Sequence, residues 1–256
     1  MDVTYLNLEK QNAEAVPLNR AKRDAEATLL NHAKHDAQRK IDEWISLNDT
    51  TVTLDLSNLN LIELPPLPSN LEKLHCFCNK LTELPELPPN LKKINCDNNQ
   101  LIKLPELLPS SLTKLRCYNN QLTKLPSLPQ GLTVLNCGGN KLTELLSLPL
   151  GLEELWCSET QLTELPDLPS NLKELDCSHG QLTELPPLPH DLKYMYCHNN
   201  QLIELPILSQ NLILMTWQNN PLQYPPPEAL GKGLLSTIKQ WMYENPRNLV
   251  KSANKC

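Results

Sequence analysis

The sequence predicts an α/β solenoid with a parallel β-sheet on its concave side, an extended, polyproline-like convex side and a helical cap at each end. The first observation is a repeat, because leucines open eight successive units at steps of 20 residues, with a single step of 21. The second is a cysteine that recurs in the same frame of seven units. The third is a composition with 23 prolines, 7 glycines and one Phe. The opening leucines are Leu71, Leu91, Leu112, Leu132, Leu152, Leu172, Leu192 and Leu212.

The N-terminal helical cap is expected over residues 21–50, preceded by a flexible segment over residues 1–20 that shows no packing pattern. Apolar residues recur at i, i+4 through RDAEATLLNHAKHDAQRKIDEWIS, with Trp44 beside them, which is typical of an amphipathic helix. Its apolar side is predicted to close the first coil, because a single repeat cannot bury its own apolar face. The stripe consists of Ala25, Leu29, Ala33, Ala37, Ile41 and Ile45.

The repeats are expected over residues 51–222, as about nine units of 20 or 21 residues that begin with a degenerate unit at Thr51. Their frame is L-x-x-L-x-C-x-x-N-x-L-T-x-L-P-x-L-P-x-x. Alternate side chains of a strand face opposite ways, so Leu155 and Cys157 are predicted to point inward and Trp156 outward. Proline fixes φ and removes a backbone donor, so the convex return of each unit is expected to be extended rather than helical.

An asparagine follows the frame cysteine by three residues in most units. Its side-chain amide is expected to bond backbone groups of the neighbouring coil, which buried turns require. Thr160 and Gly180 replace it in two successive units, where the coil is expected to be looser. The predicted ladder consists of Asn79, Asn99, Asn120, Asn140, Asn200 and Asn220.

The C-terminal helical cap and tail are expected over residues 223–256, after Trp217 has taken the place of the frame cysteine. The segment LLSTIKQWMYEN predicts a helix with Leu235, Ile238 and Met242 on one side. The tail after Pro246 shows no packing pattern.

Regular cysteines are compatible with metal binding, disulfides, reactive thiols or simple core packing. Zinc needs four converging ligands, which a one-dimensional row does not provide. Side chains in register on parallel strands also keep their Cβ atoms farther apart than a disulfide usually allows. Core packing of reduced thiols in a reducing compartment is therefore the preferred interpretation, and Cys78 and Cys256 are the thiols expected to be exposed. The ladder consists of Cys76, Cys96, Cys117, Cys137, Cys157, Cys177 and Cys197.

Several classes of function are disfavoured by composition and motifs. A net charge of −6 argues against general nucleic-acid binding, which needs a basic face. No apolar run reaches the ~18–20 residues that span a bilayer, and the N-terminus has no classical secretory signal. No phosphate-binding, nucleophile-elbow or zinc-protease motif occurs, so no catalytic, cofactor or metal site is expected. Carboxylates on successive coils, such as Glu153 and Glu174, indicate an acidic binding patch rather than acid–base catalysis.

The outward positions of the concave face are the candidate partner-binding site. They carry the chain's only Phe, and aromatic side chains of this kind favour the centres of protein interfaces. Basic residues precede acidic ones along the chain, a segregation that would orient an oppositely polarised partner. The candidate residues are Lys73, His75, Phe77, Lys93, Lys114, Arg116, Tyr118, Glu154, Trp156, Glu174, Asp176, Tyr194, Tyr196 and His198.

The frame LPxLPxxLxxLxCxxNxLTxLP, prefaced by IDEWISLNDTTVTLDLSNLNLIELPPLP, resembles the short leucine-rich repeats of bacterial type III effectors. The similar group comprises the invasion-plasmid-antigen H and Yersinia outer protein M families, and the resemblance covers roughly residues 25–222. It implies a leucine-rich repeat horseshoe that binds a host protein after secretion into the host cytosol. Related short repeats also occur in intracellular bacteria of protozoa and in large amoebal viruses.

The antigen-H ligases carry a catalytic helical domain after their repeats, whereas only about thirty residues follow the last repeat here. Ubiquitin-ligase activity is therefore not carried over. We expect a monomeric, non-enzymatic protein-interaction module. Two alternatives stay open, namely the substrate-recruiting portion of a larger enzyme and a cytoplasmic scaffold of the organism itself.

Overall fold

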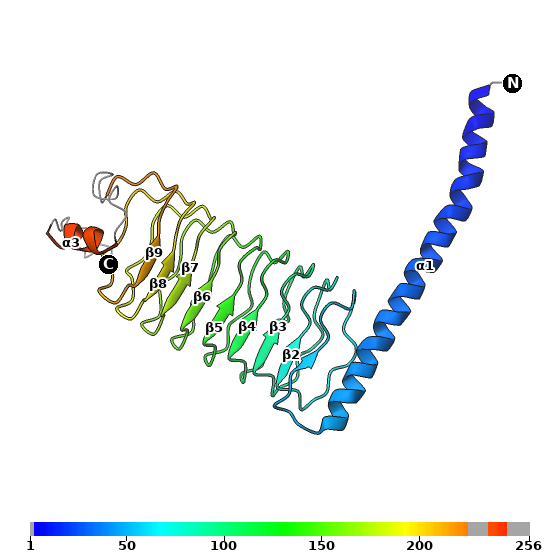
Figure 1. Cartoon of the computed structure of the whole chain (residues 1–256), viewed down its shortest axis with the longest axis horizontal. Coiled ribbons are helices and arrows are strands. Elements are labelled where there is room, and N and C mark those ends of the chain that lie inside the picture. The colour runs from blue at the N-terminus through cyan, green and yellow to red at the C-terminus, as the bar shows by residue number, and fades with distance from the viewer. Residues whose placement is uncertain (1–2, 225–234, 245–256) are drawn as a thin grey trace.

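The computed structural model describes residues 3–224 and 235–244, which form one N-terminal helix, a nine-stranded sheet and one C-terminal helix (Figure 1). Helix α1 spans Val3–Leu47 and helix α3 spans Leu235–Glu244. The strands are β1 (Leu54–Asp55), β2 (Lys73–His75), β3 (Lys93–Asn95), β4 (Lys114–Arg116), β5 (Val134–Asn136), β6 (Glu154–Trp156), β7 (Glu174–Asp176), β8 (Tyr194–Tyr196) and β9 (Leu214–Thr216).

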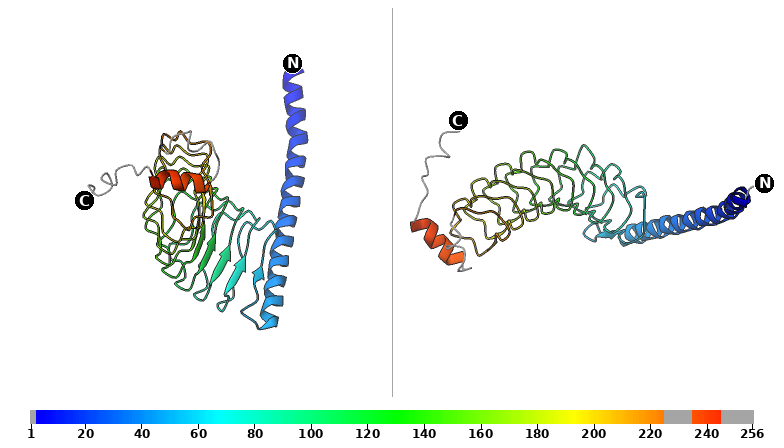
Figure 2. Two further views of the ribbon diagram at one scale, coloured as in Figure 1. Left: turned by 60° about the vertical axis from the view of Figure 1, so that its left-hand side comes forward. Right: turned by 90° about the horizontal axis from the view of Figure 1, so that it is seen from above.

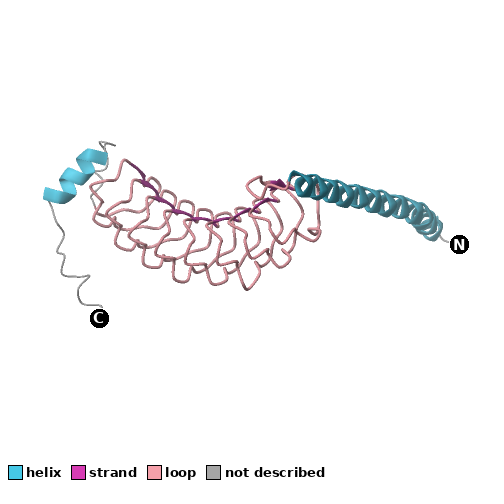
Figure 3. Ribbon diagram, turned by 90° about the horizontal axis from the view of Figure 1, so that it is seen from below, coloured by secondary structure: helices cyan, strands magenta, loops and turns pink. Residues whose placement is uncertain are grey.

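The strands pair in chain order, and every pair is parallel. One strand per coil is enough because each coil returns to the start of the next strand through its proline-containing segment. The strands line the inner side of a curved solenoid, and the return segments form its outer side (Figure 3). The predicted leucine-rich repeat horseshoe with a parallel concave sheet is confirmed.

The core is a stack of equivalent layers, one for each coil. Leu74, Leu115 and Leu155 occupy the same strand position in different coils, and none is more than 1% exposed. Because identical side chains recur at the strand spacing, each leucine packs against its counterparts in the coils before and after it. The single 21-residue step leaves the pairing intact, since Lys93 is still opposite Lys114.

Helix α1 differs from the sequence prediction in its length and in the residues that it buries. It begins at Val3, so the segment expected to be flexible is described as helix. Of the predicted stripe, Leu29 and Ile45 are 69% and 54% exposed. An i, i+4 step advances 400° around a helix, so a stripe of six residues drifts off any one face. The buried face consists of Ala33, Ala37, Ile41 and Trp44.

The C-terminal end of that helix closes the first coil. Trp44 Nε1 donates to the carbonyl oxygen of Val52 at 2.9 Å, and Lys40 Nζ donates to that of Asp55 at 3.0 Å. The remainder of α1 extends away from the solenoid (Figure 2). Within the described ranges, no helix combines the length and apolar composition needed to cross a membrane.

Helix α3 covers the last coil, where Ile238 and Met242 are buried and Leu235 packs against the core, as the sequence predicts. Lys239 Nζ donates to the carbonyl oxygens of Gln210 and Leu212 at 3.0 and 2.6 Å, which fixes the helix to the solenoid. The expectations for the tail after Pro246 lie outside the described residues.

Candidate protein-interaction surface

The frame cysteines lie in the core. All seven, from Cys76 to Cys197, are at most 2% exposed. The Cys96 thiol donates to the Arg116 carbonyl oxygen at 3.2 Å, so the small side chain also binds the next strand. Burial raises the pKa of Cys76, Cys137 and Cys197 to about 12. The thiolate needed for nucleophilic or metal chemistry is therefore disfavoured, and the prediction of core packing is confirmed.

Cys78 is exposed, as the sequence predicts, whereas Cys256 lies outside the described residues. The eight cysteines that the structure describes are all free. Among the same described ranges, no group of three or more His, Cys, Asp or Glu is arranged to hold a metal ion.

The candidate residues stand in three columns that cross the sheet, each column taking one residue from each coil. The strand register defines two of them, and the third follows the strand ends. The charge column contains Lys73, Lys93, Lys114, Val134, Glu154, Glu174 and Tyr194. The central column contains His75, Asn95, Arg116, Asn136, Trp156, Asp176 and Tyr196. The third column includes Phe77, Tyr118 and His198.

Arg116 and Trp156 form an arch over the coil that separates them. Asn136 and Val134 in that coil are both buried. The guanidinium carbon of Arg116 lies 5.5 Å from the Trp156 ring centroid, within the range of a cation–π contact. Trp156 Nε1 also donates to Glu174 Oε1 at 3.0 Å. The indole is thus held from both sides, by a cation and by a carboxylate.

Tyr118 makes a second contact across the same coil. Its hydroxyl donates to Glu159 Oε1 at 3.1 Å, and its ring lies against Gly139. Gly139 has φ +62°, and a Cβ there would lie 3.1 Å from Tyr118 Cε2 and 2.9 Å from the Asn119 nitrogen. Only glycine satisfies both constraints. Partial burial and the nearby Glu159 raise the pKa of the Tyr118 hydroxyl.

Asp97, which follows the strand end of the coil between Phe77 and Tyr118, is buried at 7% exposure. Its Oδ1 accepts the Tyr118 backbone N–H at 2.7 Å, and its Oδ2 accepts Arg116 Nε at 3.3 Å. The carboxylate thus supports the arch and the following coil instead of facing a partner. Burial raises the pKa of Asp97, although these donors oppose the shift.

Among the aromatic candidate residues, Tyr194 in the acidic half is exposed, and the others are half-buried. Tyr194 and Tyr196 are in register with Glu174 and Asp176 respectively. Partial burial and these two carboxylates raise the pKa of Tyr196. His198 lies beyond them and shares a 2.8 Å hydrogen bond between its Nδ1 and Thr216 Oγ1. The Tyr196 phenol is therefore a neutral aromatic surface edged by negative charge.

A second side-chain ladder follows the strands and was missed from the sequence. The residue two places after the frame cysteine has φ between +52° and +62° in every coil, a conformation that asparagine and glycine tolerate best. Asn119 Nδ2 donates to Asn98 Oδ1 at 2.8 Å. The sequence did contain a signal for this conformation, because six of the nine units carry asparagine or glycine at this position. The residues are Asn58, Cys78, Asn98, Asn119, Gly139, Glu159, His179, Asn199 and Asn219.

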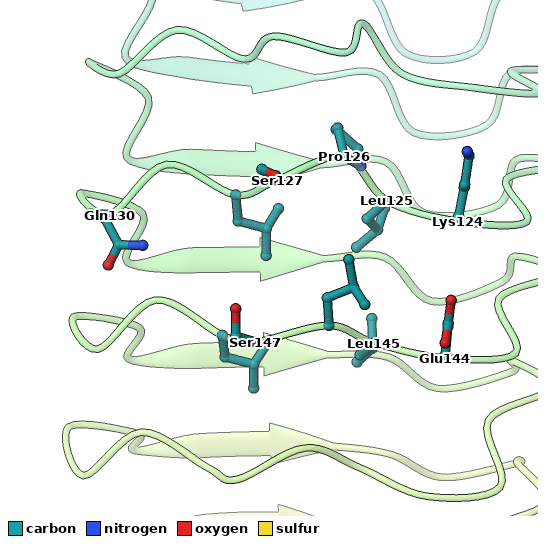
Figure 4. Close-up of a pocket in the computed structure, with 11 residues that line it drawn as sticks. Lys124, Leu125, Pro126, Ser127, Gln130, Glu144, Leu145 and Ser147 are labelled. Carbon is teal, nitrogen blue, oxygen red and sulfur yellow. The ribbon is translucent and has the colours of Figure 1, made fainter.

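A hollow of about 260 Å³ lies among the return segments, away from the strands (Figure 4). It is lined by residues 124–128, Gln130 and residues 144–148, where Leu146 stands in place of the frame proline. A second hollow of about 270 Å³ lies between two other return segments, around Leu84 and Leu104. Each lining combines frame leucines with charged side chains of adjacent coils, Lys124 and Glu144 in the first hollow and Glu83 and Lys103 in the second.

No protein-family model matches the chain, and no curated protein matches its sequence. Solved structures do match. The leucine-rich repeat domain of a Shigella effector is 29% identical, with a TM-score of 0.62, and the match covers 83% of this chain and 84% of that one. YopM, a leucine-rich effector protein from Yersinia pestis, is 34% identical with a TM-score of 0.54, covering 67% of this chain and 61% of YopM.

The functional domain of InlJ from Listeria monocytogenes, described as including a cysteine ladder, is 28% identical with a TM-score of 0.53. The match covers 68% of this chain and 45% of that domain. The resemblance to short-repeat bacterial effector proteins, which the sequence indicated, is confirmed by these similarities.

Proposed function

We propose that this leucine-rich repeat protein binds a host protein on its concave face after a bacterium has secreted it into the host cytosol. Solenoids of this fold serve in general as protein-interaction modules rather than as enzymes. Similarity to the Shigella effector domain and to YopM supports the host setting. Free cysteines throughout the described coils suit a reducing compartment.

The observation that carries the proposal is the arch of Arg116 and Trp156. A large aromatic side chain held in place before binding loses little conformational entropy when a partner arrives. Trp156 is held by a cation–π contact and a hydrogen bond, and Tyr196 lies two coils away in the same central column. Preorganised aromatic residues of this kind are the usual energetic centres of interfaces.

The test is affinity capture from a eukaryotic cell lysate with the wild-type chain and with a Trp156→Ala/Tyr196→Ala variant. We expect the variant to lose at least one partner that the wild type recovers, because truncation of a central anchor often costs about 2 kcal/mol or more. Equal recovery of every partner by both proteins contradicts the proposal.

The matched control is Leu107→Ala/Leu146→Ala, which truncates two apolar side chains that are 88% and 63% exposed on the return segments. This variant should recover the same partners as the wild type. Circular dichroism should show both double variants folded, since none of the four side chains belongs to the buried core.

Export is tested separately. A translocation reporter fused to the chain should produce a signal inside infected host cells. Retention of the fusion in the bacterium would favour the cytoplasmic scaffold, and the concave surface would then serve a partner from the same organism.

A further inference from the structure

The charge column stacks like charges beside one another. Lys73, Lys93 and Lys114 are successive register partners, and Glu154 and Glu174 are partners on the other side of Val134. Neighbouring strands lie ~4.8 Å apart, and like charges directly opposite each other destabilise a sheet. Like charges are therefore neighbours at five of the seven positions of the column, an arrangement that opposes folding.

None of these five charges forms an ion pair within the part of the chain that the structure describes. Lys73 lies near the carboxylates of Asp49 and Glu72 without pairing with either. Lys73 Nζ donates to the Thr51 carbonyl oxygen, and Glu174 accepts the Trp156 indole N–H. Neither bond neutralises a charge.

The residues that precede the charge column by one position form ion pairs, unlike the column itself. Lys92 pairs with Glu72 at 2.8 Å, and Lys173 pairs with Glu153 at 2.8 Å, each pair joining adjacent coils. Opposite charges are thus placed next to each other one residue away from where like charges are stacked. The contrast indicates that the charge column is not arranged for the stability of the free protein, which is the usual mark of a functional site.

We propose that the charge column recognises a helical segment of the partner that carries acidic residues on three successive turns, one spacer turn and basic residues on the next two. The inference rests on the proposed function and specifies the chemistry of the partner. Salt bridges to Lys73, Lys93 and Lys114 at one end, and to Glu154 and Glu174 at the other, would supply the missing ion pairs. Val134 lies opposite the spacer turn.

The spacing favours a helix over an extended strand. Successive coils are ~4.8 Å apart, whereas a helical turn rises ~5.4 Å and same-face residues of a strand are ~6.7 Å apart. Five coil steps, from Lys73 to Glu174, span ~24 Å, which is about 16 helical residues. Acidic residues stabilise a helix at its N-terminus and basic residues at its C-terminus, so the N-terminal end of the segment lies over β2.

The test uses two alanine-based helical peptides of identical composition, with three Glu and two Lys placed one turn apart. The blocked peptide has the order Glu, Glu, Glu, spacer, Lys, Lys, which complements the wild-type column. The alternating peptide has the order Glu, Lys, Glu, spacer, Glu, Lys. By fluorescence anisotropy at low salt, the wild type should bind the blocked peptide at least about fivefold more tightly, and the preference should vanish when salt screens the charges.

The decisive variant is Lys93→Glu/Glu154→Lys, which keeps the net charge and makes the column complementary to the alternating peptide. Its preference should be inverted, an outcome that loss of folding does not produce. The control Glu153→Lys/Lys173→Glu exchanges a neighbouring ion pair at the same net charge and should keep the wild-type preference. Equal affinity of the wild type for both peptides, or no inversion in a folded decisive variant, overturns the proposal.

A third peptide replaces two spacer-face alanines of the blocked peptide with proline and is not helical. It should bind at least about fivefold more weakly than the blocked peptide, because its charges no longer face one side. Equal binding overturns the helical occupant. Failure of all the peptide tests, while the Trp156→Ala/Tyr196→Ala variant still loses a partner from lysate, rejects this inference and leaves the proposed function standing.

Discussion

At the scale of single residues, the ladder cysteines show why a small, weakly polar side chain recurs at this position. The thiol fills the buried layer and can also donate a weak hydrogen bond, as Cys117 does to the Asn136 carbonyl oxygen at 3.3 Å. Alanine would leave this carbonyl without the thiol contact. The thiols therefore contribute to stability only while they are protonated.

Alkaline pH should unfold the protein for this reason. Burial holds the folded-state pKa of Cys76, Cys137 and Cys197 at about 12, whereas an exposed cysteine titrates near ~8.5. The unfolded chain loses these protons first, so the stabilisation is complete below pH ~8.5 and is lost as pH rises toward 12. Each thiol then contributes about 1.4 kcal/mol of lost stability per pH unit.

Urea denaturation at several values from pH 7 to 10.5 measures this slope. A Cys137→Ala/Cys157→Ala variant should be less stable than the wild type at pH 7 but should lose stability less steeply with pH. Parallel curves for the two proteins would contradict the assignment of the slope to the thiols.

At the scale of a single coil, the asparagine ladder connects neighbouring repeats where their backbones cannot pair. Asn140 Oδ1 accepts the Leu122 N–H at 3.0 Å, and its Nδ2 donates to the Cys117 carbonyl oxygen at 2.9 Å. Thr160 keeps only one such bond, from its hydroxyl to the Cys157 carbonyl oxygen in its own coil. In the described coils, the Leu142 N–H has no side-chain acceptor corresponding to the one at Leu122.

Replacing Thr160 with Asn should therefore stabilise the solenoid. Asparagine would restore the bond to the Leu142 N–H and a bond back to the preceding coil, for a gain of about 1 kcal/mol. Thr163→Asn, on an exposed neighbouring position, should change stability by less than about 0.5 kcal/mol. Urea midpoints measure both effects. If the Thr160→Asn variant is no more stable than Thr163→Asn, the missing ladder bonds do not contribute to the free energy of unfolding.

The sequence predicted the coils well because their positions repeat. The leucine frame determines which strand residues face inward. It placed Leu155 and Cys157 inside, where they are buried, and Trp156 outside, where it is half-buried. It did not predict the arch, because a contact from Arg116 to Trp156 depends on small residues in the coil between them. Nor did it predict the burial of Asp97, whose carboxylate turns back to accept a backbone N–H.

At the scale of the whole molecule, the solenoid depends on the covers at its two ends. A linear array in which each coil contacts only its neighbours unfolds most easily from an uncovered end. Helix α1, at ~1.5 Å per residue, is ~68 Å long, yet its buried contacts are confined to its C-terminal part, from Ala33 to Trp44 among the side chains described. The N-terminal cover is therefore a short stretch of a long helix.

Ala37→Glu should detach this cover. Ala37 is fully buried, so the new carboxylate would have to be desolvated or expelled, at a loss of about 2–4 kcal/mol. Hydrogen exchange should accelerate first in β1 and β2 and last in the coils near β6. Leu29→Glu, on an exposed position of the same helix, should leave exchange unchanged. Uniform acceleration along the whole sheet would show that the array unfolds as one unit and not from its end.

The regular row of buried thiols also allows the number of unfolded coils to be counted. One cysteine marks each coil from Cys76 to Cys197, so every coil that opens offers one further sulfur to an alkylating reagent, each addition increasing the mass by the same amount. In a Cys256→Ser background the intact protein should acquire a single adduct, at Cys78, and a partly unravelled one should acquire as many more as it has lost coils. The mass of one labelled molecule would thus record how far along its length it had come apart.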